Sequence, residues 1–167
     1  MSAYSMIAKQ VNADTFRAVL CMTEGYLEYQ GPLLVNFYNT PELVDQILNL
    51  GNICVLKPEL YPDPNRPHDI MRAQHNVTLF CGRDLSYDKY CSKHLTSEDM
   101  SRMASQIDYV YVFDLTGTWK YAKGPNYTKG LRDIKKYLDV LEKGIGPLEP
   151  GQGVIIDDQL YEDLDED

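Results

Sequence analysis

The sequence predicts a single α+β domain, in which helices pack on a mainly antiparallel sheet of four to five strands. Three observations lead to this fold class. The length of 167 residues suits one domain with its own core. Several short apolar runs end at Gly, Pro or Asn, which is typical of strands. Other runs have apolar residues at helical spacing behind capping residues. We place the domain at residues 1–150 and predict a flexible acidic tail at residues 151–167.

In the first half of the chain, proline and threonine set the predicted element boundaries. Pro32 predicts the start of a short helix, because proline is well tolerated in a first helical turn. Thr40 and Pro41 predict a second helix with Thr40 as its cap. Four prolines in the stretch after residue 56 exclude a long helix or a central strand. The elements predicted here are a strand at 15–23, helices at 33–38 and 41–50, a strand at 52–56 and an irregular excursion at 57–75.

The second half is dominated by a predicted β-hairpin at residues 107–121, with its turn at Gly117. The first strand of the hairpin has apolar residues on both faces, for example Tyr111 and Val112. Such a strand is expected at the centre of a sheet that is covered on both sides. Thr96 and Asp99 have the spacing of a capping box. The other elements predicted here are a strand at 76–82 and helices at 97–105 and 127–143.

The net charge of −9 is concentrated at the C-terminal end. The last eleven residues contain seven acids and no base, and the remaining chain has 18 acids against 16 bases. The nearly neutral body argues against direct nucleic-acid binding. The tail is interpreted as a solvated end, as a docking segment for a basic partner or as a nucleic-acid mimic. The residues expected to dock in the second case are Asp157, Asp158, Tyr161, Glu162 and Asp163.

No complete catalytic or metal-binding motif occurs in the sequence. The four cysteines have neither CxxC nor zinc-type spacing, and they are expected to be free thiols. The three histidines lack helical His-x-x-x-His spacing, so neither a metal nor another cofactor is predicted. Because no signal peptide or membrane-spanning run is found, we expect a cytoplasmic protein without a membrane partner.

Several short segments occur together in a particular order. They are EGYLE at 24–28, FYNT at 37–40, LGN at 50–52, GRD at 82–84, DYVYVF at 108–113 and WKY at 119–121, the last two separated by Gly117. In this order they resemble a family of small proteins encoded by phages and prophages. Glu24 and Leu27 replace the Asp and Pro of that family's D-G-Y-P-E element. The resemblance implies a phage accessory protein that acts in the host cytoplasm, in host takeover or defence evasion.

The expected activity is binding, either to a host protein or to a small nucleotide-type signal. Arg83 could bind a phosphate or carboxylate, or form an internal ion pair that holds its loop. Trp119 could be a core residue or a stacking surface, and a buried Asp108 would need a partner such as Arg83 or Arg17. One alternative is an acidic inhibitor that mimics nucleic acid, and another is a small hydrolase that uses Glu24, Glu28 and Asp108. The candidate binding residues are Glu24, Tyr26, Glu28, Arg83, Asp84, Asp108 and Trp119.

Overall fold

An eight-stranded mixed sheet forms the middle of the structure, which is a computed structural model that describes residues 3–87 and 92–144. The strands are β1 (Ser5–Asn12), β2 (Thr15–Cys21), β3 (Ile53–Val55), β4 (Leu79–Phe80), β5 (Lys93–Thr96), β6 (Tyr109–Phe113), β7 (Trp119–Lys123) and β8 (Arg132–Asp133). The helices are α1 (Leu27–Phe37), α2 (Pro41–Leu50), α3 (Cys81–Leu85), α4 (Ser97–Ala104), the 3₁₀ helix η1 (Gly124–Lys129) and α5 (Ile134–Gly144).

The strand order is β4-β3-β2-β1-β6-β7-β8, with β5 paired to β2 outside this path. The predicted α+β class is confirmed, but the sheet is larger than the predicted four to five strands and is mixed. Its central pair, β1 and β6, is parallel, as is the β2–β3 pair, and the other pairs are antiparallel. The prediction was wrong because it omitted β1, the polar strand β5 and the two-residue strand β8.

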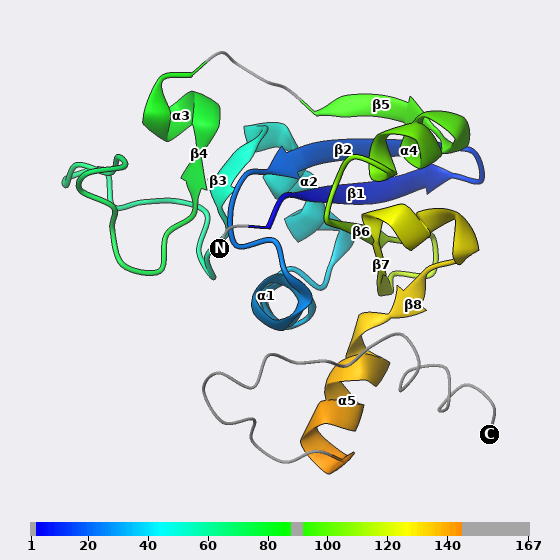
Figure 1. The fold of residues 1–167 in the computed structure, drawn as a ribbon. Coiled ribbons are helices and arrows are strands. Elements are labelled where there is room, and N and C mark those ends of the chain that lie inside the picture. The colour runs from blue at the N-terminus through cyan, green and yellow to red at the C-terminus, as the bar shows by residue number, and fades with distance from the viewer. Residues whose placement is uncertain (1–2, 88–91, 145–167) are drawn as a thin grey trace.

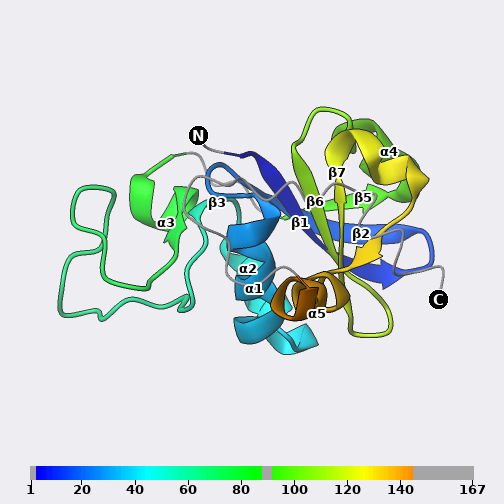
Figure 2. The same ribbon diagram turned by 60° about the horizontal axis from the view of Figure 1, so that its bottom comes forward.

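Helices cover both faces of the sheet to different extents. Helices α1, α2 and α5 share one large apolar cluster on one face, and α4 packs against a second cluster on the opposite face. Figures 1 and 2 show α1, α2 and α5 together, with α4 on the other side of the strands. The alternating side chains of β6 enter both clusters, Tyr111 one and Val112 the other. The predicted central position of this strand is therefore confirmed.

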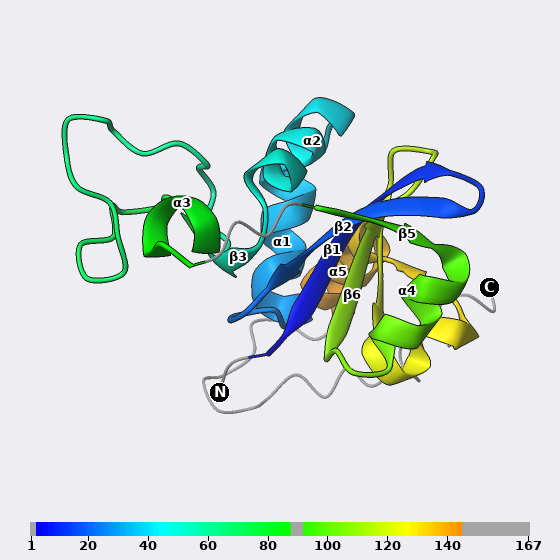
Figure 3. The same cartoon turned by 90° about the horizontal axis from the view of Figure 1, so that it is seen from above.

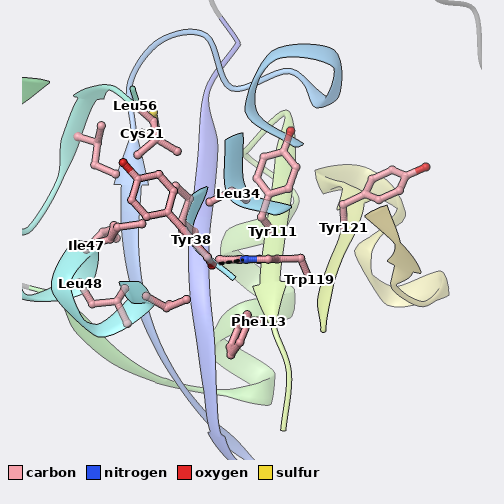
Figure 4. Close-up of a cluster of buried hydrophobic side chains, with 14 of the residues drawn as sticks. Cys21, Leu34, Tyr38, Ile47, Leu48, Leu56, Tyr111, Phe113, Trp119 and Tyr121 are labelled. Atoms are coloured by element: carbon pink, nitrogen blue, oxygen red, sulfur yellow. Dashed lines mark hydrogen bonds between the residues drawn. The ribbon is translucent and has the colours of Figure 1, made fainter. Parts of the chain in front are cut away.

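The larger cluster is closed by aromatic side chains from the hairpin. Trp119 is 4% exposed, and its indole Nε1 donates a hydrogen bond to the carbonyl oxygen of Tyr38 at 2.8 Å (Figure 4). The rings of Phe113 and Trp119 meet edge to face, with 5.2 Å between centroids. The interpretation of Trp119 as a core residue is confirmed, and its ring is not available at the surface as a stacking platform.

Several local predictions hold and three boundaries are wrong. Thr40 caps α2 by accepting from the N–H of Leu43, and Thr96 with Asp99 forms the predicted capping box of α4. The helix predicted at 33–38 begins six residues earlier. The strand predicted at 76–82 is only two residues long and turns directly into α3. The helix predicted at 127–143 begins at Ile134, because η1 and β8 occupy its first part.

The proline-rich excursion at residues 57–75 contains no helix or strand and is irregular, as predicted. It projects from the body at the end of the sheet opposite α4 (Figure 3). Within the described residues, no helix is long and apolar enough to cross a membrane.

Candidate functional site

A cavity of about 690 Å³ lies on the face of the sheet that α4 covers only in part. The neighbouring ends of β1 and β2 form its base through Met6, Ala18 and Leu20. Helix α4 contributes Met103, β5 contributes Leu95 and Lys93, and the α3 region contributes Cys81, Ser86 and Tyr87. The remaining lining residues are Tyr4, Val19, Met22 and Asn52.

The cavity exists because the outer edge of β2 is paired in two separate pieces. Residues 15–18 pair with β5, whereas Cys21 pairs with β3. Between these two strands the N–H of Leu20 is satisfied by a side chain, the Oδ1 of Asn52, at 2.9 Å. The backbone N–H of Leu20 is thus satisfied, but among the described residues no strand or helix lies over the side chains of Leu20 and Met22. Met22 is consequently 43% exposed.

The lining is apolar and adaptable, with a cation at its edge. Three of the side chains are methionines, which fill irregular spaces and adjust readily to different ligands. Burial raises the pKa of the Tyr4 phenol and of the Cys81 thiol, so both groups are neutral hydrogen-bonding groups near neutral pH. The exposed Lys93 supplies the positive charge. This combination suits a ligand with a flat or apolar part and one anionic group.

The predicted loop residues Glu24, Tyr26 and Glu28 lie outside this cavity. The Tyr26 hydroxyl donates a short hydrogen bond to the Glu24 carboxylate, and this bond raises the pKa of Tyr26. Glu24 itself has a positive φ of 57°, and Glu28 is exposed in the first turn of α1. The structure brings Glu24 together with Tyr26, and the Glu24 carboxylate is already occupied by an internal donor.

Arg83 and Asp84 hold the excursion against the body. The Arg83 guanidinium contacts both carboxylate oxygens of Asp84, at 2.7 and 2.9 Å, and donates to the carbonyl oxygens of Leu60 and Thr78 at 2.7 and 3.1 Å. The buried Asp84 also accepts from the N–H of Phe80 at 2.8 Å. The internal ion pair considered for Arg83 is therefore present, and all three of its nitrogens are engaged.

Asp108 acts on the cavity indirectly. It is paired with neither Arg83 nor Arg17. Its carboxylate accepts from the N–H of Tyr4 at 2.8 Å, and its own N–H donates to the Tyr4 carbonyl at 2.9 Å. Arg17 instead donates to Ser92, next to Lys93, at 2.9 and 3.1 Å. Asp108 thus holds the backbone of the cavity residue Tyr4, and Arg17 holds the side chain of Ser92 beside the cavity residue Lys93.

The cavity was missed from the sequence because no motif marks it. One signal was present: Phe16, Ala18, Leu20 and Met22 form an apolar row that extends past the elements able to cover it. Among the described residues, no group of three or more His, Cys, Asp or Glu side chains is placed to hold a metal ion. The predicted docking residues at 157–163 lie outside the described residues. No protein-family model, curated protein or solved structure matches the chain.

Proposed function

We propose that this protein is a binding protein that holds a small ligand in the cavity between β2, α4 and β5. The ligand class is a molecule with a planar or apolar part and one anionic group, and a nucleotide-type signal belongs to this class. The observation that supports the proposal is the cavity itself. Its volume of about 690 Å³ is within the range of small-molecule sites, and its lining is mostly apolar with few polar groups.

The chemistry of the lining favours binding over turnover. The cavity thiol, Cys81, is held protonated by burial and is therefore a poor nucleophile. The carboxylates considered for a hydrolase do not line the cavity. In the setting implied by the resemblance to phage proteins, the protein would sequester a host signal during infection.

The test uses anilinonaphthalene sulfonate, a fluorescent probe that has aromatic rings and one sulfonate. We expect one probe to bind per chain. Ala18→Phe should fill the base of the cavity and lower the affinity at least tenfold, whereas the matched control Ala13→Phe, in the exposed β1–β2 turn, should bind normally. Lys93→Met should weaken binding about fivefold, which is about 1 kcal/mol, through loss of the charge. Unchanged affinity in both Ala18→Phe and Lys93→Met would reject the cavity as the site.

Competition then tests the ligand class separately. A nucleoside monophosphate that displaces the probe from the wild-type chain, but binds poorly to Lys93→Met, supports a nucleotide-type ligand. If neither mono- nor dinucleotides displace the probe, nucleotide-type ligands are excluded. The cavity as the binding site would then still be tested by Ala18→Phe and Lys93→Met.

A second candidate function is protein binding through the excursion. The excursion exposes Tyr61, Ile70 and Met71, at 58%, 58% and 87%, although such side chains are usually covered. Gln74 stiffens the segment by bonding to the carbonyls of Asp63, Arg66 and Pro67, and a preordered loop loses little entropy on binding. Native mass spectrometry separates the two functions. A host-protein complex lost in Met71→Asp but kept in Ala18→Phe would favour this second candidate.

A further inference from the structure

The body of the protein is nearly neutral in total, but its charges are segregated along the chain. Residues 120–136 contain six bases and a single acid, whereas residues 1–119 contain nine bases and 14 acids. The basic stretch runs through β7, η1, β8 and the start of α5, at the edge of the sheet opposite β4 (Figure 1). We call this stretch the basic edge.

Part of the basic edge surrounds one small hollow. Lys123, Lys129 and Arg132 line a space of about 170 Å³ together with Asn126. Lys123 and Lys129 are exposed, and within the described part of the chain neither meets a carboxylate. By contrast, Lys120 is paired with Asp114 at 2.9 Å. Because both cations line one hollow, an anionic segment placed here would be attracted to them.

We propose that the basic edge is the docking surface for the chain's own acidic segment, residues 157–167. Charge complementarity supports this choice, because seven acids follow in one run of eleven residues. Leu160, Tyr161 and Leu164 lie among those acids and supply apolar groups that a merely solvated segment would not need. This proposal concerns a different surface from the ligand cavity and does not depend on it.

Covalent connection makes the docking favourable even though single surface ion pairs are weak. Helix α5 packs on β7 at its first turn, where the rings of Tyr137 and Tyr121 are 5.8 Å apart, so the helix begins close to the basic edge. The eleven residues of α5 extend about 16 Å. The next twelve residues can span up to about 40 Å, so the acidic segment can reach back to Lys129. A short tether of this kind gives an effective concentration of about millimolar.

The test is zero-length carbodiimide cross-linking of the full chain, followed by peptide mapping. A carboxylate forms an amide with a lysine only when the two are in contact. We expect cross-links from residues 157–167 to concentrate on Lys123 and Lys129 and to disappear at about 1 M salt, where screening is strong. Equal yields on Lys57 and Lys93, or yields that salt does not change, would overturn the proposal.

Two controls make the result specific. In the variant Lys123→Glu/Lys129→Glu the acidic segment should no longer dock, so its cross-links to the other lysines of the basic edge should also be lost. In the control variant Lys57→Glu/Lys93→Glu the cross-links to the basic edge should be unchanged. A mixture of heavy- and light-isotope chains distinguishes docking within one chain from docking onto a second copy. Cross-links that join heavy to light chains at all protein concentrations would contradict docking within one chain.

A second readout is independent of cross-linking. A full chain whose seven terminal acids are changed to amides should elute from immobilised heparin at higher salt than the wild type, because the basic edge is uncovered. Adding Lys123→Glu/Lys129→Glu should reverse this shift. If the amide variant elutes with the wild type, the acidic segment does not cover the basic edge and the proposal is wrong.

Discussion

The carboxylate of Asp114 organises the turn between β6 and β7. It accepts hydrogen bonds from the N–H groups of Thr116 and Thr118 at 2.9 and 3.1 Å, and it lies 2.9 Å from the Nζ of Lys120. Gly117 has a φ of 78°, which glycine adopts without strain. Burial alone would raise the pKa of Asp114, but the Thr116 hydrogen bond, Lys120 and Thr118 outweigh it and hold the pKa below its usual value of 3.8.

Asp114→Asn should therefore destabilise the protein in a pH-dependent way. A carboxylate whose pKa is depressed in the folded state stabilises that state above the unfolded pKa and loses this contribution as the pH falls. We expect a loss of about 1 kcal/mol at neutral pH and a smaller loss at about pH 3, below the usual pKa of 3.8, measured by urea unfolding. An equal loss at both pH values would mean that the charge does not stabilise the turn.

Trp119→Ala should be among the most destabilising single changes. The ring is buried against Phe113, and its removal also leaves the Tyr38 carbonyl without its donor. The expected loss is about 3–5 kcal/mol in the free energy of unfolding. The control Leu115→Ala, at a side chain that is 58% exposed, should change it by less than about 0.5 kcal/mol. Similar losses in the two variants would contradict the core position of Trp119.

At the level of elements, helices and turns that are determined by neighbouring residues could be predicted from the sequence. The caps at Thr40 and Thr96 and the turn at Gly117 each depend on residues within one turn. Helix α1 was placed too late because Gly31 and Pro32 normally interrupt helices. Gly31 permits close packing at this point: a Cβ atom would lie 3.0 Å from the Leu27 side chain and 3.3 Å from Ile134 of α5, both tighter than ordinary contacts.

Arg83 provides the prediction at this scale. Arg83→Ala should loosen the excursion without unfolding the sheet, because the guanidinium joins Leu60, Thr78 and Asp84. Hydrogen exchange at the Glu59 and Thr78 amides, which close the base of the excursion, should become faster, while β6 stays protected. Arg102→Ala removes a comparable but exposed pair with Asp99 and should leave the excursion unchanged. Exchange that is unchanged at residues 59–78 in Arg83→Ala would refute this role.

At the scale of the whole molecule, the sheet order and the cavity could not be predicted. The parallel pairing of β1 with β6 joins segments about 100 residues apart, and no local pattern encodes it. The cavity depends on two other long-range pairings, of β2 with β5 and of β2 with β3, because these leave the gap beside Met6 and Ala18. The basic edge was missed for another reason. The total charge of the body is near zero because the excess of bases at residues 120–136 is cancelled by the excess of acids at residues 1–119.

The methionines allow a direct measurement of where a ligand binds. Met6, Met22 and Met103 line the cavity, whereas Met71 lies in the excursion, outside the cavity, and is 87% exposed. Methyl NMR spectra of the full chain with ¹³C-labelled methionine can be recorded during titration with anilinonaphthalene sulfonate. The account predicts saturable shifts of the three cavity methyl signals and an unchanged Met71 signal. A shift of Met71 while the cavity signals stay fixed would contradict the proposed ligand site.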